Sequence, residues 1–431
     1  MILSMLPATF EERRRDEQLP REELAAWQLQ RVNQLLDRIL PANPFYRAKL
    51  GDGPLRLTSL AQFSELPFTT KQELMPQGSA GDYARNQTFP LEQYVRFHRT
   101  SGTRGRPLAV ADTAEDWAAW IAQWQYVLDA AGIQRGDRVV CAFSFGPFIG
   151  FWSAFEACIA RGVMTIPGGG MSSRARLELL RDVDATAVLC TPSYALHLAE
   201  VARQSGLELG SGNLRALIVA GEPGGSLPSV RRRIETAWNA RVVDHAGATE
   251  VGPWGYPDSA GRGLFVNERS YVAEVLEPGG EKPVDEGQLG ELVLTTLDRV
   301  GAPVVRYRTG DLVRPRWKHA QRTRFVWLEG GVVGRADEML IIRGVNLFPS
   351  SLDEIIRGFP EIAEYRAIVS SRDALDTLRI EIEGDATSVE QLATALQVRL
   401  GLHVDVVLVP AGSLPRFEGK GRRLSDERTH S

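Results

Sequence analysis

The sequence predicts an α/β protein with a large N-terminal doubly wound α/β domain, an added β subdomain and a small C-terminal α+β domain. Strand-like and helix-like runs alternate between Arg138 and Asp244, as in a parallel sheet that helices cover on both faces. From about Gly261 the pattern changes to alternating β segments, and beyond Gly334 short strands and two helices follow. We therefore place the N-terminal domain at residues 1–335 and the C-terminal domain at residues 336–431.

Length and composition set the broad class of protein. At 431 residues, with 43% hydrophobic and 24% charged residues, the chain is expected to form an ordinary globular protein of two or three domains. The net charge of −4 favours neither nucleic acid nor a membrane as a partner. The uncharged stretch 139–155 is shorter than a membrane span. Three cysteines without a C-x-x-C pair indicate a reduced, cytoplasmic setting.

The N-terminal part of the chain is predicted to be helical. Apolar residues recur at helical spacing from Leu24 to Leu40. Thr69 or Thr70 is placed to cap a further helix. The run Asp116–Ala131 predicts an amphipathic helix that ends at Gly132.

The alternating region contains the elements of a parallel sheet. Strands are predicted at Arg138–Phe143, Val163–Ile166, Ala187–Cys190, Leu214–Val219 and Arg241–Asp244. Helices are predicted at Ile149–Ala160, Arg174–Asp182, Pro192–Gln204 and Pro228–Trp238. Small, polar, Gly-containing or Pro-containing loops follow the strands, and in an open parallel sheet such loops gather at the carboxyl edge, where ligands bind. The sequence therefore predicts a ligand site at that edge.

The rest of the chain is predicted to contain further strands and the C-terminal helices. The β subdomain has predicted strands at Tyr271–Leu276, Gly290–Thr295 and Val304–Tyr307. The C-terminal region has predicted strands at Met339–Arg343, Glu364–Val369, Arg379–Glu383 and His403–Val409. One helix is expected from Ser350, and a second from a Thr387–Glu390 capping box to Leu400.

The loop Arg99–Pro107 has the composition of an anion-binding loop. It holds three hydroxyls, two glycines and three arginines. Glycines let backbone N–H groups approach an anion, and hydroxyl and guanidinium groups donate to phosphate oxygens. The loop lacks the spacing of a Walker phosphate loop. Its composition is compatible with phosphate binding and also with a polar hairpin turn.

Taken together, several motifs resemble those of the adenylate-forming superfamily of acyl-CoA synthetases and adenylation domains, and most closely the phenylacetate–CoA ligase family. The phosphate loop matches from Thr100 to Pro107, and Leu66–Lys71 is similar to the N-terminal signature of that family. The other matching motifs are Gly221-Glu222-Pro223, Gly247-Ala248-Thr249-Glu250, Tyr307–Leu312, Gly334–Asp337, Met339–Ser350 and Gly419-Lys420. They occur in the family's order from about residue 60 to the end of the chain.

The resemblance implies a set of site residues. Those expected to bind the nucleotide are Thr100, Ser101, Gly102, Thr103, Gly105, Gly221, Glu222, Pro223, His245, Ala246, Gly247, Asp311 and Arg335. The catalytic residues would be Lys420, Thr249 and Glu250, and Glu250 would also bind Mg²⁺. Lys420 would bridge the substrate carboxylate and the α-phosphate of ATP, and Asp311 would accept hydrogen bonds from the ribose. The attacking carboxylate is already ionised, so positioning and electrostatics rather than a strong base carry this reaction.

The resemblance also implies that the C-terminal domain is mobile. It would turn about a hinge at Asp337, move Lys420 out of the site and bring Arg343 and Gly344 in. The thiol of CoA could then attack the acyl-adenylate. Gly344 has no side chain, which would let the pantetheine arm pass close to the backbone.

Two departures from the family pattern concern binding. The family usually has an aromatic residue against adenine at the position of Ala246, and His245 or a neighbouring aromatic residue could take that role. The stretch from Arg316 to Gly330 lacks the cysteines that some relatives carry, so no structural zinc is expected.

Aromatic residues after the first strand of the parallel sheet predict an acyl pocket. Phe145 and Phe148 flank the strand-end loop, and with Gly169 they would suit an aromatic or other apolar carboxylic acid. The neighbouring Phe151 and Trp152 are also explained as plain core.

The leading hypothesis is an ATP-dependent carboxylate–CoA ligase. It would activate an aromatic (arylacetic or aryl) acid as acyl-AMP, release pyrophosphate and transfer the acyl group to CoA. One alternative is an adenylation enzyme that passes the acyl group to a carrier protein or an amine. Another is a catalytically inactive nucleotide-binding regulator, which Ala246 keeps open. The sequence decides neither the acid, nor the acceptor, nor whether the chain forms a homodimer.

Overall fold

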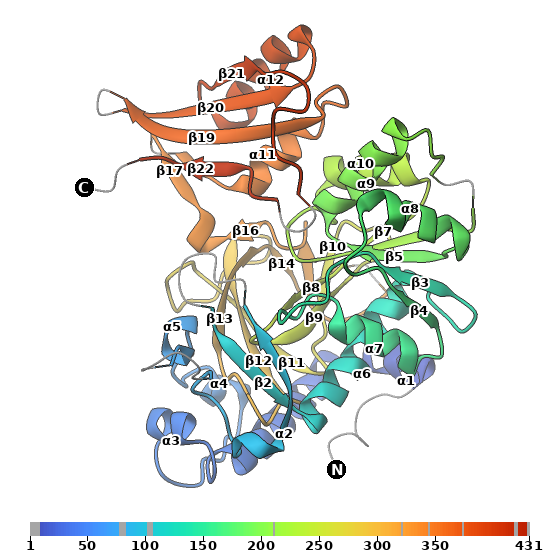
Figure 1. Cartoon of the computed structure of the whole chain (residues 1–431). Coiled ribbons are helices and arrows are strands. Elements are labelled where there is room, and N and C mark those ends of the chain that lie inside the picture. The colour runs from blue at the N-terminus through green and yellow to red at the C-terminus, as the bar shows by residue number, and fades with distance from the viewer. Residues whose placement is uncertain are drawn as a thin grey trace.

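The computed structural model of the chain describes residues 9–76, 83–100, 107–209, 212–319, 322–343, 345–372, 375–417 and 421–428. A large body carries a smaller C-terminal domain, which lies at the top of the view in Figure 1. The body contains a parallel sheet and two largely antiparallel sheets, and the C-terminal domain contains a mixed sheet with helices. The predicted fold class is confirmed.

The five-stranded parallel sheet of the body has the strand order β4-β3-β5-β6-β7. Its strands are β3 (Arg138–Cys141), β4 (Met164–Pro167), β5 (Ala187–Cys190), β6 (Ala216–Val219) and β7 (Arg241–Asp244). All five predicted strands are present. The chain passes from β3 outward to β4 and then to β5 on the other side of β3. The loops beyond β3 and β5 therefore flank a crevice of the kind in which such sheets bind ligands.

Helices cover both faces of the parallel sheet. They are α6 (Ala114–Ala131), α7 (Trp152–Ala160), α8 (Ser173–Asp182), α9 (Pro192–Gln204) and α10 (Pro228–Trp238). Val139 of β3 lies in one core with residues of α6 and α7, whereas Val140 lies in a second core with residues of α8, α9 and α10. Successive residues of a buried strand point to opposite faces, so this strand is apolar throughout. Gly132 ends α6 at φ +67°, as predicted.

The β subdomain consists of two sheets. The first is β14-β15-β10-β9-β8 and the second is β11-β12-β13-β16. The strands are β8 (Ala246–Ala248), β9 (Gly252–Pro257), β10 (Gly263–Val266), β11 (Tyr271–Leu276), β12 (Gly290–Thr296), β13 (Tyr307–Val313), β14 (Pro315–Arg316), β15 (Trp327–Glu329) and β16 (Gly334–Arg335). The strand predicted at Val304–Tyr307 is wrong in position, because Arg306 adopts φ +47° and the extended run begins only at Tyr307.

The N-terminal segment packs helices against the body. They are α1 (Phe10–Asp16), α2 (Arg21–Ile39), α3 (Pro44–Leu50), α4 (Leu60–Phe63) and α5 (Lys71–Leu74), followed by the strands β1 (Tyr94–Arg99) and β2 (Ala109–Thr113). Helix α2 confirms the helix predicted at residues 24–40. Of the two candidate caps, Thr70 caps α5 in a capping box with Glu73, while the hydroxyl of Thr69 donates to the carbonyl of Val305 at 2.7 Å.

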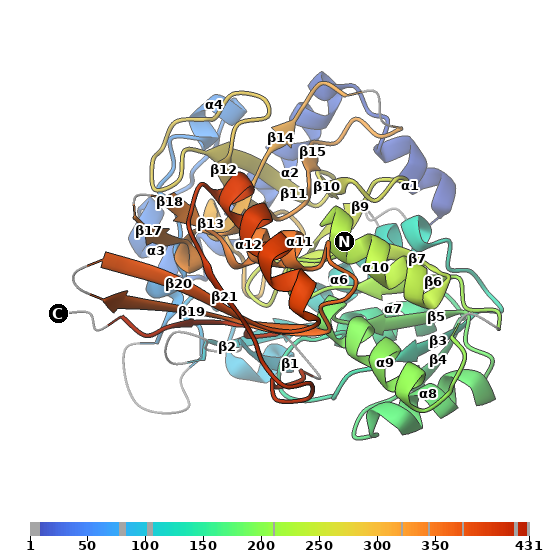
Figure 2. The ribbon, with the colours of Figure 1, turned by 90° about the horizontal axis from the view of Figure 1, so that it is seen from above.

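The C-terminal domain has its own hydrophobic core, which includes Leu352, Ile380 and Leu392. Its elements are β17 (Leu340–Ile342), β18 (Val345–Leu347), α11 (Pro349–Ile356), β19 (Glu364–Arg372), β20 (Leu375–Glu383), α12 (Ala386–Leu400), β21 (Asp405–Leu408) and β22 (Leu424–Asp426). The larger sheet has the order β21-β20-β19-β22. Seen from above in Figure 2, this domain lies over the body with α11 beside α10.

The predicted start of the last helix needs a correction. Asp385, not Thr387, is the N-cap of α12, because its carboxylate accepts the backbone N–H of Ser388 at 2.8 Å. The hydroxyl of Thr387 donates to the same carboxylate at 2.7 Å instead of capping the helix. Of the helices that the structure describes, none combines the length and the apolar character that crossing a bilayer requires.

Candidate active site

The predicted phosphate loop connects β1 and β2, which form an antiparallel hairpin. Thr100 closes the base of this loop: its N–H donates to the carbonyl of Leu108, and its hydroxyl accepts the N–H of Leu108, both at 3.0 Å. The backbone N–H of Arg99 donates to the carbonyl of Pro147 in the loop after β3. Ser101, Gly102, Thr103 and Gly105 lie outside the described residues. The end of β1 at Arg99 thus lies against the loop that follows β3, at the carboxyl edge of the parallel sheet.

Glu222 joins the loop after β6 to the start of α9 and to the C-terminal segment. One carboxylate oxygen accepts the backbone N–H of Ser193 at 2.6 Å, and the other accepts the backbone N–H of Gly421 at 2.7 Å. Burial raises the pKa of Glu222 above its ordinary value, although these hydrogen bonds oppose the rise. Gly221 has φ +97°, so the turn that presents Glu222 favours glycine. Lys420 itself lies outside the described residues, but the residue that follows it is held at this edge.

Glu250 lies in the turn between β8 and β9 and is only 6% exposed. Its Oε1 is 2.8 Å from the Nζ atom of Lys71, at the start of α5. The guanidinium of Arg299 donates to the carbonyl oxygen of Glu250 at 2.5 Å and to that of Thr249 at 3.4 Å. This arrangement fixes the backbone of the turn and leaves the Glu250 carboxylate beside the half-exposed ammonium group of Lys71.

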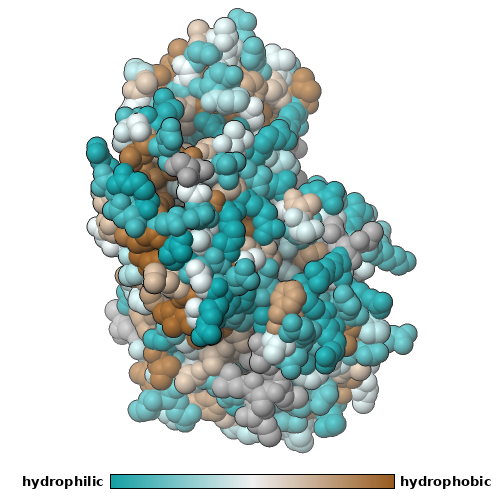
Figure 3. All heavy atoms as spheres, turned by 90° about the vertical axis from the view of Figure 1, so that its right-hand side faces the viewer, coloured by the Kyte–Doolittle hydropathy of each residue, from teal (hydrophilic) through white to brown (hydrophobic). Residues whose placement is uncertain are grey.

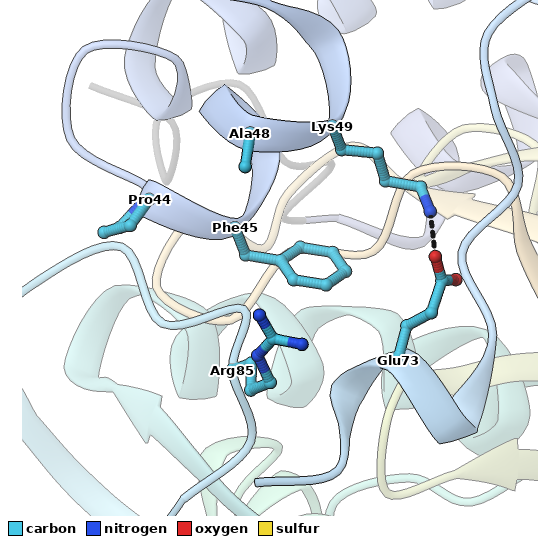
Figure 4. Close-up of a pocket in the computed structure, with 6 residues that line it drawn as sticks. All are labelled: Pro44, Phe45, Ala48, Lys49, Glu73 and Arg85. Atoms are coloured by element: carbon cyan, nitrogen blue, oxygen red, sulfur yellow. Dashed lines mark hydrogen bonds and ion pairs between the residues drawn. The ribbon is translucent and has the colours of Figure 1, made fainter. Parts of the chain in front are cut away.

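Helix α5 is also held in place by an ion pair with helix α3. Lys49 of α3 donates to Glu73 at 2.5 Å, and both residues line a cavity of about 440 Å³ together with Phe45 and Arg85 (Figure 4). The pKa of Glu73 lies below its ordinary value, because hydrogen bonds from Lys49 and Thr70 outweigh the effect of burial. Helix α5 thus contacts α3 through the pair of Glu73 with Lys49, and it contacts Glu250 through Lys71.

Asp311, Arg335 and Asp337 form a chain of ion pairs. Asp311 and Arg335 are opposite each other on β13 and β16, and Arg335 Nη1 is 3.0 Å from Asp311 Oδ1. The Nε atom of Arg335 donates to Asp337 at 2.9 Å, in the turn that leads to the C-terminal domain. Gly310 has φ +76°, and a Cβ atom there would be 3.0 Å from the Arg335 guanidinium, so this strand requires glycine to let the arginine pass.

Tyr307 is the first residue of β13, the strand that also carries Asp311. Burial raises its pKa well above the ordinary value, the negative charges of Glu250 and Asp311 raise it further, and the positive charge of Arg335 opposes them. Tyr307 itself is a buried, neutral side chain.

Phe145 is enclosed by aromatic rings at the carboxyl edge of the sheet. Its ring centroid is 4.5 Å from that of Phe143 and 4.6 Å from that of Trp152. A Cβ atom at Gly169 would be 3.1 Å from the Phe145 ring, so the glycine lets this ring approach the loop after β4. Phe148, by contrast, is 45% exposed. Phe145 and Gly169 therefore lie together, and Phe148 is on the surface.

His245 follows β7 and lies in the interior. Its ring centroid is 4.2 Å from that of Trp124, and its Nδ1 lies 2.7 Å from the carbonyl oxygen of Gly255. Ala246 and Gly247 belong to β8, in which Ala246 is paired with Gly255. A Cβ atom at Gly247 would be 3.3 Å from His245 Nε2. The imidazole is thus packed against Trp124, and contact with adenine stays a prediction.

We expect His245 to make the stability of the protein depend on pH. Burial lowers its pKa from 6.5 to about 4. Between these pH values the unfolded chain therefore binds a proton at His245 that the folded chain does not bind. The associated stabilisation is present above about pH 6.5 and is lost as the pH falls toward 4. Urea unfolding should show a loss of about 2 kcal/mol from this group between pH 8 and pH 5.

The matched variant for this test is His245→Gln, which keeps a donor for the Gly255 carbonyl and does not titrate. Its unfolding free energy should fall less between these pH values than that of the wild type. Part of the dependence should remain, because burial also lowers the pKa of His98 to about 4. Equal slopes for the two proteins would contradict the assignment.

Two residues that the predicted thiol path needs are on the C-terminal domain. Arg343 has φ +49°, and its Nε atom donates to the carbonyl of Asp376 at 2.7 Å. Gly344 lies outside the described residues. Asp337, the predicted hinge, lies in a 3₁₀ turn (Ala336–Glu338) between β16 and β17.

The site also contains residues that the sequence reasoning did not assign to it. Lys71 belongs to the N-terminal signature, which predicts no chemical role for it, and Arg299 belongs to none of the motifs. Lys71 carries one available signal, since lysine is rare in this arginine-rich chain. Arg299 carries none, because its partners come from distant parts of the sequence.

Glu250 is the predicted ligand of Mg²⁺. Among the described residues, no group of three or more His, Cys, Asp or Glu side chains could hold a metal. Mg²⁺ at nucleotide sites is commonly held by one or two carboxylates with substrate phosphates and waters. Glu250, a lone buried carboxylate paired with a half-exposed lysine, fits that mode of binding.

Comparison with known proteins identifies the family. Residues 55–296 match the model of the AMP-binding enzymes, and residues 344–428 match that of the AMP-binding enzyme C-terminal domain. The chain is 33% identical to the phenylacetate-coenzyme A ligase of Escherichia coli (strain K12), over 94% of this chain and 95% of the relative. It is 30% identical to the enzyme of that name from Thermus thermophilus, over 96% and 98% of the two chains.

A solved structure of a related enzyme adds information on conformation. With 2-hydroxyisobutyryl-CoA ligase in the postadenylation state, the TM-score is 0.89 at 29% identity, over 96% of this chain and 91% of that one. With the same enzyme in the thioesterification state, bound to 2-HIB-AMP and CoA, the TM-score is 0.72 at 30% identity, over 96% and 92% of the two chains. The domain arrangement described above therefore resembles the first state more than the second.

These matches define the class of protein as an AMP-forming acid–CoA ligase, which uses ATP to make an acyl-AMP and passes the acyl group to CoA. The match to the E. coli relative is above 30% identity over nearly the whole of both chains. The chain therefore belongs to the phenylacetate–CoA ligase family of the adenylate-forming superfamily.

Proposed function

We propose that the enzyme activates an aromatic carboxylic acid, of the arylacetic or aryl type, and transfers it to CoA. The observation that carries this proposal is the aromatic enclosure around Phe145, next to Gly169 at the ligand edge of the parallel sheet. Such an enclosure favours a flat apolar group through burial and ring contacts. The names of the relatives, which are phenylacetate-coenzyme A ligases, support the same class of acid.

In the proposed adenylation step, a carboxylate oxygen of the acid forms a bond to the α-phosphorus of ATP, and the bond to pyrophosphate breaks. The hairpin loop that begins at Thr100 would hold the phosphates, and Asp311 would accept hydrogen bonds from the ribose. Lys420 would stabilise the charges on the two anions that must meet. When bound, Mg²⁺ supplies charge neutralisation at the phosphates, and Glu250 is the residue that would hold it.

Lys71 extends this proposal. In the structure its ammonium group neutralises Glu250, and its side chain is half exposed. A lysine stem is flexible, so the ammonium group can turn from the carboxylate toward a phosphate oxygen when the nucleotide arrives. Thr249, whose backbone Arg299 fixes, would donate its hydroxyl to a phosphate oxygen.

In the proposed second step, the sulfur of CoA bonds to the acyl carbon and AMP leaves with the electrons of the former anhydride bond. The C-terminal domain, which we propose to begin at residue 336, would first turn about Asp337 and bring Arg343 and Gly344 to the acyl-adenylate. The proposal includes a cytoplasmic location, for which the three buried free thiols are suited. Association into a homodimer stays a prediction that the mass in solution tests.

The experiment that tests the function is a pyrophosphate-release assay with a panel of arylacetic, aryl and alkyl acids, with and without CoA. We expect release with the aromatic acids, and mass spectrometry should find the aryl-CoA product when CoA is present. Phe145→Ala should raise the KM for the preferred acid about tenfold, because it removes the ring contacts that we propose this partly buried side chain makes with the acid.

Phe148→Ala tests the other phenylalanine predicted for the acyl pocket, and we expect it to raise the KM less than Phe145→Ala does, because Phe148 is 45% exposed. Release with alkyl acids alone would contradict the substrate class. Release that needs a carrier protein or an amine in place of CoA would change the acceptor, and no release with any acid would overturn the proposed function.

A further inference from the structure

The segment on either side of Lys420 is bound to the N-terminal domain at three points, all around helix α9. Before the lysine, Arg416 pairs with Glu200 of α9 at 2.9 and 3.0 Å. After it, Gly421 donates its N–H to Glu222 at 2.7 Å. Two residues further, the Nη1 atom of Arg423 donates to the hydroxyl of Ser193 at 2.8 Å. The segment is therefore anchored upstream and downstream of the lysine.

The two arginines of this segment, Arg416 and Arg423, are also held by carboxylates of the C-terminal domain. The guanidinium of Arg416 holds Glu383 of β20 at 2.7 Å while it holds Glu200, so a single side chain joins the two domains. Arg423 forms a two-pronged pair with Glu364, at 2.7 and 3.0 Å, and the positive charges of Arg357 and Arg423 lower the pKa of Glu364 to about 2 despite its burial. These pairs hold the two arginines in the conformation that meets α9.

The residues of the N-terminal domain that bind this segment, Ser193 and Glu222, are also hydrogen-bonded to each other. Ser193 is in the first turn of α9, where its backbone N–H has no partner within the helix and binds Glu222 at 2.6 Å. Glu222 thus divides its two carboxylate oxygens between the backbone N–H groups of Ser193 in α9 and of Gly421. A Cβ atom at Gly421 would be 2.9 Å from Ser193 Oγ, so the backbone passes close to the helix.

The contacts at these three points are polar. The surface on the α8–α10 side of the molecule is mostly hydrophilic (Figure 3). Partly exposed ion pairs and hydrogen bonds cost little to exchange for water, unlike a buried apolar contact. Such an interface suits a domain that must dock for one step and leave for the next. The higher similarity to the postadenylation state of a relative than to its thioesterification state fits docking for the first step.

From this geometry we infer that Glu200, Glu222 and Ser193 are positioning residues for the adenylation step, because they dock the segment that carries Lys420. The inference rests on the proposed role of Lys420. It assigns to Glu222 a function in docking the C-terminal segment, in addition to its predicted place in the nucleotide loop. The docking residues serve one half-reaction only, since the C-terminal domain leaves them before the thiol attacks.

The test measures the two half-reactions separately, with phenylacetate as the probe. Single-turnover pyrophosphate release from ATP reports the first, and phenylacetyl-CoA formation from prepared phenylacetyl-AMP and CoA reports the second. Glu200→Gln should slow the first about three- to tenfold, which corresponds to the loss of one charge-assisted contact that is partly exposed. It should leave the second within about twofold of the wild type.

Two further variants sharpen the assignment. Glu222→Gln should lower kcat for the first half-reaction about tenfold, and this loss should exceed any change in the KM for ATP that follows from the predicted place of Glu222 in the nucleotide loop. Arg416→Gln should act through the same contact as Glu200→Gln, so the double variant should be no slower than the slower single variant. Glu178→Gln is the control, because it removes a carboxylate from α8 whose pair, Arg174, is on the same helix.

The outcomes separate this inference from the function on which it rests. If Glu200→Gln slows both half-reactions equally, or slows neither, the docking inference is overturned. It is also overturned if Glu222→Gln changes only the KM for ATP. Thermal melting of each variant shows whether a loss reflects unfolding. A wild-type enzyme that releases no pyrophosphate with any acid of the panel would overturn the proposed function, and this inference with it.

Discussion

Lys420→Ala is expected to abolish acyl-adenylate formation while ATP binding stays largely intact. The reaction brings a carboxylate to a phosphate, and removing the ammonium group that we propose to bridge them would leave that repulsion uncompensated. The rate of pyrophosphate release should fall by about 10²-fold to 10³-fold, the scale seen when one preorganised charge donor is removed. Binding of ATP measured by calorimetry should change by less than about 1 kcal/mol.

The same variant supplies its own control. Thioester formation from prepared acyl-adenylate and CoA should proceed at nearly the wild-type rate, because in the proposed second step the C-terminal domain has turned and carried Lys420 out of the site. Unchanged pyrophosphate release would remove Lys420 from the mechanism. A parallel loss of ATP binding would indicate a role in nucleotide affinity instead of chemistry.

The second large effect concerns stability. Arg299→Met should lower the free energy of unfolding by about 3–5 kcal/mol, because it leaves a buried carboxylate without its partner. Arg299 Nη2 is 2.6 Å from Asp112, and both side chains are at most 2% exposed. Burial raises the pKa of Asp112 to about 6, and the arginine opposes the rise. Urea unfolding at pH 7.5 measures the change.

Arg299→Met/Asp112→Asn is the matched variant for this prediction, since it removes the carboxylate charge as well. It should recover part of the lost stability, and a double variant less stable than Arg299→Met would contradict the argument. Loss of the bonds from Arg299 to the carbonyls of Thr249 and Glu250 should lower activity in both variants. A change in unfolding free energy below about 1 kcal/mol for Arg299→Met would show that the pair contributes little.

The fold was largely accessible from the sequence because its signals are local. The helix predicted at Pro192–Gln204 is α9 with the same ends, since Thr191 caps it and Pro192 suits its first position. Strand β9, in contrast, was missed. Its sequence, Gly-Pro-Trp-Gly-Tyr-Pro at residues 252–257, contains the residues that normally interrupt strands, and only burial by neighbouring sheets explains it.

The site was accessible only in part. The motif residues Asp311 and Arg335 prove to be neighbours across two strands, although the sequence showed them only as separate motifs. The pair Lys71–Glu250 and the contacts of Arg299 join segments that are far apart in the chain, and no local pattern predicts such pairs. The docking of Gly421 on Glu222 depends on how two domains meet, which their separate sequences do not specify.

Arg335 is shared between a proposed ribose ligand and the proposed hinge, since it pairs with both Asp311 and Asp337. If a bound nucleotide alters the Arg335–Asp311 pair, the energy of the Arg335–Asp337 pair changes as well. The energy needed to rotate the C-terminal domain then changes with it. Thermodynamic reciprocity then requires that rotation of the domain change the affinity of the site for AMP. A single guanidinium would in this way couple the timing of domain reorientation to product departure.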